Sequence, residues 1–330
     1  MKIWFCPYEL QPHLQLNAND EAQTRDGVLL KIQLADGGVG FSDCHPWIQF
    51  KDADWREQIK SLKEDRPLPL ISRSLELALW DSSSRSRGIS LFPKQPLLKS
   101  HYTLTDTTQF SLAQLQQIVA QGYDVVKLKL GRDLRSDREF LRRLIPIAPE
   151  QLKLRLDFNL KPSFEELMNW FEGLGQDIRE RFDFIEDPFE YSLDSWSTFK
   201  ERWGCPLAID QSLSADMDLA AADVLIIKPG RVNGETINTC VEKWGHKRWV
   251  FTHSMDHPVG RMMALGFAMN FYQVNPEKVE VGGFESAEFY KRTLFDDQIY
   301  QDGALQLGTD GAGIGFDAQL EELDWETLLP

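Results

Sequence analysis

From about residue 100 onward, short apolar segments alternate with longer stretches of helical periodicity. The predicted strands are 101–105, 125–130, 152–158, 182–188, 206–210, 224–229, 248–254 and 278–283. Helix-like stretches separate most of them, for example 111–121, 137–145, 163–174 and 261–272. Strands that alternate with helices form parallel sheets, and eight such units close into a (β/α) barrel. The sequence therefore predicts an α/β fold built on a barrel.

The first hundred residues lack this repeat and have the pattern of a mixed α+β domain. Segments 28–34 and 39–42 flank Asp36-Gly37-Gly38, a turn signal that predicts a β-hairpin. Residues 53–63 and 72–85 are predicted helices. This part of the chain is thus expected to form a sheet covered by helices.

The C-terminal residues add no further β/α unit, and we expect them to pack back on the N-terminal part. The predicted division is an N-terminal α+β capping domain at 1–99, a catalytic barrel at 100–290, and a C-terminal segment at 291–330 that returns to the capping domain. A chain of 330 residues is long enough for such a two-part architecture.

Composition excludes several classes of function. The formal net charge of −15 argues against a surface for nucleic acid or anionic membrane, although a small anionic substrate can still bind at a locally cationic site. The four cysteines are scattered without a C-x-x-C pair, which argues against a zinc site or a disulfide framework. The N-terminus lacks the apolar stretch of a signal peptide, and no segment has the length of a membrane span. We therefore expect a cytoplasmic protein.

Charged residues alternate with apolar residues on two of the predicted strands. Lys127 and Lys129 share one face of segment 125–130, and Arg155 and Asp157 share one face of the next strand. In a barrel the apolar face meets the surrounding helices, so these charges would point inward. For a single alternating strand, a solvated polar face is the more common explanation.

The pattern continues over the following strands, which makes that explanation less adequate. Glu186, Asp210 and Lys228 lie at the C-terminal ends of three more predicted strands, where barrel enzymes build their active sites. Opposite charges gathered at low dielectric are costly unless they are paired or bind a metal. Asp157, Glu186 and Asp210 offer only carboxylate oxygens, which suit Mg²⁺ or Mn²⁺ better than zinc.

Five motifs occur in order at β/α spacing: K-x-K (Lys127, Lys129), R-x-D-x-N (155–159), I-E-D-P (185–188), A-I-D-Q-S (208–212) and I-K-P (227–229). This series resembles the enolase superfamily, muconate-lactonising branch, and within it the o-succinylbenzoate synthases are most similar. T-R-D-G at 24–27 resembles the start of that family's second capping strand, and G-A-G-I-G-F-D at 311–317 resembles its return segment. The resemblance implies a modified TIM barrel, (β/α)7β, with an α+β capping domain formed by the N-terminal part and the C-terminal tail.

The resemblance also implies roles for these residues. One Mg²⁺, or Mn²⁺, would be held by Asp157, Glu186 and Asp210. Lys129 would be the base, Lys127 would assist it electrostatically, and Lys228 would lie on the opposite face of the substrate. Asn159, Ser254 and Arg155 are the expected contacts to a small anionic carboxylate substrate.

The implied reaction is the syn-dehydration of 2-succinyl-6-hydroxy-2,4-cyclohexadiene-1-carboxylate to o-succinylbenzoate, through proton abstraction beside a carboxylate and an enediolate. A carbon acid of this kind is so weak that a metal must neutralise the charge that develops on its oxygens. A lysine base must also be neutral, and two ammonium groups on one strand face lower each other's pKa.

Two alternative functions are compatible with the same residues. An N-acylamino acid racemase, or another epimerase or cycloisomerase on the same scaffold, would use Lys129 and Lys228 as opposed acid and base. A barrel that binds an acid without turnover is the third interpretation. Dipeptide epimerases carry D-x-D at the end of the eighth strand, where this chain has V-G-G-F-E-S (281–286), which counts against dipeptides.

Three further features depart from the family pattern or concern specificity. Relatives often have an acid where this chain has Gln211. His253 and His257 follow the seventh strand and are expected to be structural, as lone histidines at strand ends usually are. The polar loop near residues 14–24 is expected to influence the choice of substrate.

Overall fold

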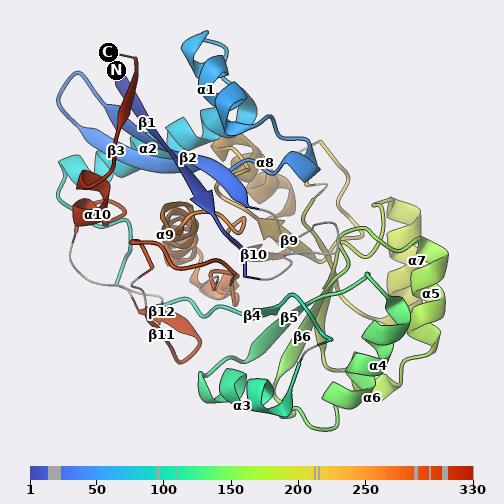
Figure 1. Ribbon diagram of the computed structural model, residues 1–330. Helices are drawn as coiled ribbons and strands as arrows, with labels where there is room; N and C mark the ends of the chain where they lie inside the picture. The colour runs from blue at the N-terminus through green and yellow to red at the C-terminus, as the bar shows by residue number, and fades with distance from the viewer. Residues whose placement is uncertain are drawn as a thin grey trace.

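The structure is a computed structural model that describes residues 1–13, 24–94, 97–108, 110–211, 213–214, 216–285, 289–296, 299–306 and 311–329. The predicted specificity loop therefore lies outside the described residues, except for its last position. Figure 1 shows an antiparallel sheet with helices at one end of the molecule and a larger barrel with its helices at the other. Both chain ends lie in the antiparallel part.

The cap is a four-stranded sheet in the order β13-β1-β2-β3. Its strands are β1 (Lys2–Leu10), β2 (Arg25–Gln33), β3 (Val39–Cys44) and β13 (Glu326–Leu329). The predicted hairpin is confirmed, because β2 and β3 pair antiparallel around a turn in which Gly37 has a φ of 90°. Strand β2 also begins at the T-R-D-G motif, as expected.

Strand β1 was not predicted, because Pro7 and Glu9 interrupt its apolar pattern. The pairing explains how the proline is tolerated. Strand β13 pairs with β1 only at Ile3, Trp4 and Phe5, so Pro7 lies beyond the paired stretch on that side. A residue without an N–H is acceptable where the strand has an open edge.

Two helices, α1 (Trp55–Lys63) and α2 (Pro69–Ser86), cover one face of the cap sheet, and both were predicted. The cap has its own core of sheet and helix residues: Ile3, Val28, Leu30, Ile32, Cys44, Ile59, Leu62, Leu70, Ile71 and Ala78. Helix α2 packs on β3, and β3 also contacts the barrel helix α9 (Pro258–Val274), which places β3 at the junction with the barrel.

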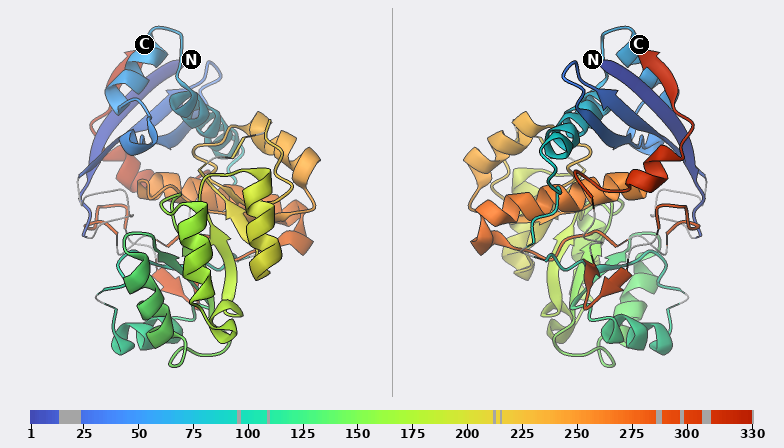
Figure 2. Two further views of the ribbon diagram at one scale, coloured as in Figure 1. Left: turned by 90° about the vertical axis from the view of Figure 1, so that its right-hand side faces the viewer. Right: turned by 90° about the vertical axis from the view of Figure 1, so that its left-hand side faces the viewer.

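The barrel contains a parallel sheet in the order β10-β9-β8-β7-β6-β5-β4. Its strands are β4 (Tyr102–Leu104), β5 (Val125–Lys129), β6 (Lys153–Asp157), β7 (Phe182–Glu186), β8 (Leu207–Ile209), β9 (Val224–Ile227) and β10 (Arg248–Phe251). The helices are α3 (Leu112–Ala120), α4 (Leu134–Leu144), α5 (Phe164–Glu172), α6 (Gln176–Arg179), α7 (Leu193–Trp203), α8 (Gly234–Trp244) and α9 (Pro258–Val274). Figure 2 shows helices flanking the outside of this sheet, so the expected fold is confirmed.

The eighth predicted strand, 278–283, does not form as a strand, and this expectation was wrong in detail. Residues Pro276–Lys278 form a 3₁₀ turn, and only Gly282 and Gly283 make parallel bridges, one to Ser100 and one to Thr252. These bridges still join the two edges of the sheet. The glycines allow a close approach, since a Cβ on Gly282 would lie 2.8 Å from the Phe251 carbonyl oxygen.

The C-terminal residues first contact the barrel and then the cap. A short hairpin, β11 (Ile299–Gln301) and β12 (Ala304–Gln306), contacts the barrel through the Gly303 carbonyl, which accepts the Ser100 N–H. Gly313 then bridges Ser90, and α10 (Asp317–Glu321) leads to β13 beside β1 (Figure 2). The return to the cap expected for 311–317 is thus observed, whereas the exact domain boundaries remain predictions.

Among the described helices, none combines the length and apolar character that a membrane span requires.

Candidate active site

A cavity of about 530 Å³ lies at the C-terminal ends of the barrel strands, under the edge of the cap. The barrel contributes Lys127, Lys129 and Lys228 to its wall, and the cap contributes Trp47, Gln49, Phe50 and Lys51. The volume is in the range of small-molecule sites. The position agrees with the expectation that the charged strand ends form the site.

The cap residues reach the cavity through a turn that is fixed at both ends. Asp52 accepts the N–H of Trp47 at 2.7 Å and also pairs with Arg231 of the barrel at 2.7 Å. Trp47 Nε1 donates to the Ser254 carbonyl at 2.9 Å. The cap turn is therefore tied to the loops that follow β9 and β10.

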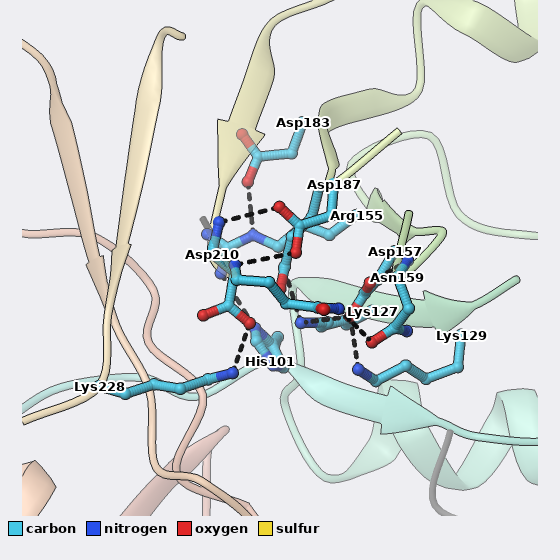
Figure 3. A network of polar contacts seen from close by, with 12 residues as sticks. His101, Lys127, Lys129, Arg155, Asp157, Asn159, Asp183, Asp187, Asp210 and Lys228 are labelled. Atoms are coloured by element: carbon cyan, nitrogen blue, oxygen red, sulfur yellow. Dashed lines mark hydrogen bonds and ion pairs between the residues drawn. The ribbon is translucent and has the colours of Figure 1, made fainter. Parts of the chain in front are cut away.

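Strand register places the predicted base beside the predicted metal ligands (Figure 3). Lys129 pairs with Asp157 across β5 and β6, and Asp157 pairs with Glu186 across β6 and β7. Lys129 Nζ lies 2.5 Å from Asp157 Oδ2. Lys127 Nζ lies 2.9 Å from the same oxygen and 2.6 Å from Glu186 Oε2. Lys228 pairs with Asp210 from another part of the wall.

The two lysines of β5 differ in their electrostatic surroundings. Burial alone lowers the pKa of Lys127, but the carboxylates of Asp157 and Glu186 outweigh it and raise that pKa above the ordinary lysine value. Burial and then the neighbouring Lys127 ammonium lower the pKa of Lys129, against the opposing effect of Asp157. Lys129 is thus the lysine of this pair that gives up its proton more easily.

The carboxylates form a set that could hold a metal ion. Oxygens of Glu186, Asp187 and Asp210 lie within 4.8 Å of one another. Burial and the nearby Asp157 raise the pKa of Glu186, and its Oε1 is buried without a hydrogen-bond partner among the described residues. A buried carboxylate oxygen without a donor is costly, and a hard cation would satisfy it.

This set differs from the predicted one by including Asp187 in place of Asp157. Asp187 has a second task, because its two oxygens accept the N–H groups of Asp210 at 3.0 Å and Gln211 at 3.1 Å. Its φ of 44° is unusual for a non-glycine residue. Asp187 was not among the predicted site residues, although its place in the I-E-D-P motif was a signal. We assign it to holding the Asp210 loop.

Asn159 and Ser254, two of the three predicted substrate contacts, line the cavity. Asn159 Oδ1 also accepts from Gln211 Nε2 at 3.2 Å, so Gln211 connects the ends of β6 and β8. Arg155, the third predicted substrate contact, is not among the cavity-lining residues. It is 1% exposed, donates to Asp183 and to the Val281 carbonyl at 2.7 Å each, and lies over the Phe184 ring.

The histidines also have distinct positions. His257 accepts the Val259 N–H at the start of α9, and burial followed by the nearby His45 lowers its pKa to about 3, which fits the expected structural role. His253 lines the cavity and lies 3.1 Å from Asp256. His101, which the sequence did not single out, lines the cavity as well. Burial and then Arg155 lower the pKa of His101 well below the ordinary value, so its ring is neutral.

Comparison with known proteins agrees with this arrangement. Residues 3–84 match the family described as "O-succinylbenzoate synthase, N-terminal domain", and residues 111–323 match "Enolase C-terminal domain-like". An o-succinylbenzoate synthase of Bdellovibrio bacteriovorus is 31% identical over 99% of both chains. The chain belongs to the enolase superfamily, in its muconate-lactonising branch.

Solved structures of this superfamily share the fold but differ in reaction. The N-succinyl Arg/Lys racemase of Bacillus cereus has a TM-score of 0.80 at 14% identity, with 99% of each chain covered. A muconate lactonizing enzyme of Pseudomonas fluorescens has a TM-score of 0.77 at 16% identity, with 95% of each chain covered. At such identities the likeness shows the fold alone.

Proposed function

We propose that this enzyme catalyses the metal-dependent syn-dehydration of 2-succinyl-6-hydroxy-2,4-cyclohexadiene-1-carboxylate to o-succinylbenzoate. The observation that carries the proposal is the convergence of Lys129, its neighbour Lys127 and the buried carboxylates on one cavity, with Lys228 at another part of the wall. The similarity to a synthase along the full chain supports the choice of substrate.

The proposed ligands of a divalent cation are Asp157, Glu186 and Asp210. The donor set is all oxygen, and one Glu186 oxygen has no hydrogen-bond partner in the described part of the chain, so these residues fit Mg²⁺ or Mn²⁺. Such a cation, when bound, stabilises the negative charge that develops on a substrate carboxylate. Asp187 holds the backbone that carries Asp210 through the two amide hydrogen bonds described above.

The protein's own residues then move the proton. Lys129 takes the ring proton beside the carboxylate in its neutral form and passes it to the departing hydroxyl on the same face. Lys127 stays charged, because its pKa is raised, and it favours the neutral form of Lys129. Lys228 stabilises the developing anion and need not transfer a proton. The Trp47–Asp52 turn, held by the Trp47 N–H to Asp52 hydrogen bond, forms part of the cavity wall.

An N-acylamino acid racemase is the second candidate. Lys129 and Lys228 both line the cavity, as opposed acid and base residues would, and a racemase of N-succinyl amino acids shares the fold. The two reactions differ in their demand on Lys228, which only racemisation needs as a proton carrier. That difference makes the candidates separable by experiment.

The test is to incubate the purified enzyme with Mg²⁺ and the cyclohexadiene substrate and to follow formation of the aromatic product by absorbance. Lys129→Ala is expected to lower kcat about 10³-fold or more, because it removes the base. Lys153→Ala is the matched control, since Lys153 is an exposed lysine at the start of β6, at the end of the strand away from Asp157. Absence of aromatic product from the metal-loaded wild type would refute the proposed reaction.

Deuterium exchange at Cα of the substrate tests the alternative, the racemase activity. If the enzyme is a racemase, N-succinyl amino acids exchange their Cα proton in heavy water, and Lys228→Ala abolishes the exchange with one or both enantiomers. A dehydratase without racemase activity shows no such exchange in the wild type.

A further inference from the structure

The hydrogen-bond partner of His101 determines which of its ring nitrogens carries the proton. Arg155 Nη1 lies 3.0 Å from His101 Nδ1 (Figure 3). A guanidinium group has donors only, so Nδ1 must be the acceptor. The neutral ring therefore carries its hydrogen on Nε2, because the nitrogen opposite a donor is the unprotonated one.

Arg155 is itself held in place by several groups. Asp183 and the Val281 carbonyl accept its N–H groups at 2.7 Å each, and the Phe184 ring lies 4.6 Å below the guanidinium. The side chain is almost fully buried, so it cannot turn away to release His101. The buried arginine thus fixes the tautomer and the orientation of the histidine.

The Nε2 edge of His101 lies against the part of the cavity wall formed by Gly283. A Cβ added to Gly283 would lie 2.8 Å from both Nε2 and Cε1 of the ring. Any larger residue at this position would press on that edge, and glycine leaves it open. Both residues line the cavity, and no described residue is hydrogen-bonded to Nε2.

We infer that His101 is a substrate-binding residue that donates Nε2–H to a carbonyl or carboxylate oxygen of the ligand, with Arg155 as its positioning residue. A neutral N–H donor recognises an oxygen acceptor and cannot serve an ammonium group. The subsite therefore favours acyl acids over ligands with a free amine. The inference rests on the proposed function only for the choice of the ligand used as a probe.

Two substitutions distinguish the acceptor role of His101 Nδ1 from the donor role of Nε2. In His101→Asn, the amide oxygen can still accept from Arg155, but the donor toward the cavity is lost. In His101→Gln, the longer side chain can place an amide N–H near the position of Nε2. Binding of o-succinylbenzoate in the presence of Mg²⁺, measured by calorimetry, is expected to weaken about 10- to 100-fold in His101→Asn. His101→Gln is expected to recover most of that loss.

Unchanged affinity in His101→Asn would overturn the inference. Equal loss in both variants would overturn it too, because His101 would then act only through packing. The second measurement needs no ligand: ¹⁵N NMR of histidine-labelled enzyme reports the tautomer, and the signal missing in His101→Asn identifies the residue. An Nδ1–H tautomer would contradict the inference. Failure of the wild type to bind o-succinylbenzoate would instead count against the proposed function, while the NMR result would still decide on His101.

Discussion

Lys127 Nζ lies 2.6 Å from Oε2 of Glu186, and both side chains are buried inside the barrel. Removing one partner of a buried pair leaves an uncompensated charge, which costs about 3–5 kcal/mol. Lys127→Met is therefore expected to lower the free energy of unfolding by about that amount in the presence of a chelator. Saturating Mg²⁺ should recover part of the loss, because a bound cation compensates the same carboxylates. Urea denaturation with EDTA or Mg²⁺ measures both effects.

Lys60→Met provides the control for this prediction. Lys60 is exposed on α1 and its ammonium group lies at the long distance of 3.9 Å from Glu64, so its removal should change stability by less than about 0.5 kcal/mol. If Lys127→Met were as stable as Lys60→Met with EDTA, Lys127 would not be the countercharge of the buried carboxylates.

The metal ligands can be assigned by comparing two acidic residues. Asp157→Asn is expected to weaken Mg²⁺ binding about 100-fold, because the proposed ligand set loses a charged oxygen. Asp137→Asn is the matched control, since Asp137 is also a buried aspartate beside β5 but lies outside the carboxylate cluster. Calorimetric titration of the metal into each variant gives the affinities. Wild-type affinity in Asp157→Asn would favour Glu186, Asp187 and Asp210 as the ligands.

Much of the barrel was predictable, because parallel β/α units repeat a local pattern. Seven of the predicted strands formed, and Lys127, Lys129 and Asp157 point inward as their alternation indicated. The structure of the eighth segment, 278–283, could not be predicted from side-chain alternation. Its two glycines have no side chains to alternate, and their close approach to Phe251 and His101 depends on the closed barrel.

The positions of several side chains at the site also depend on the closed barrel and could not be predicted from the sequence. The R-x-D-x-N motif placed Arg155 and Asp157 on one strand face, but it could not show that they point toward different ends of the barrel interior. Arg155 extends toward Asp183, at the start of β7, and toward His101. His101 itself has no motif, because its role depends on a partner 54 positions away in the chain.

The connection between cap and barrel should affect substrate binding more than chemistry. Asp52 holds both the Trp47 N–H and Arg231, so Asp52→Ala frees the turn that carries Trp47 and Phe50 over the cavity. We expect KM for the substrate to rise about 10-fold, a loss typical of one charge-assisted contact, with a smaller change in kcat. Steady-state kinetics measure the two separately. Lys60→Ala, on the same domain but far from the cavity wall, should leave both unchanged, and a pure kcat effect of Asp52→Ala would contradict the prediction.

Titration of the buried Asp137 carboxyl is expected to make the stability of the protein depend on pH, independently of the active site. Its Oδ2 accepts the Gly131 N–H at 2.8 Å, and burial raises its pKa to about 6 from an ordinary value near 3.8. The folded state therefore binds this proton more tightly than the unfolded state. The resulting stability is fully present below about pH 4 and is lost as the pH rises through 6.

Asp137→Asn removes this titration, while the amide oxygen can still accept the Gly131 N–H. Relative to wild type, the variant should gain stability between pH 4 and pH 6 and keep a gain on the order of 3 kcal/mol above pH 6. Urea denaturation across this range measures the difference, in which titrations common to both proteins cancel. Asp133→Asn is the comparison. Hydrogen bonds from Ser136 lower the pKa of exposed Asp133, so this variant should be less stable than wild type in the same pH range, whereas Asp137→Asn should be more stable. A pH-independent difference for Asp137→Asn would show that the buried carboxyl does not titrate in this range.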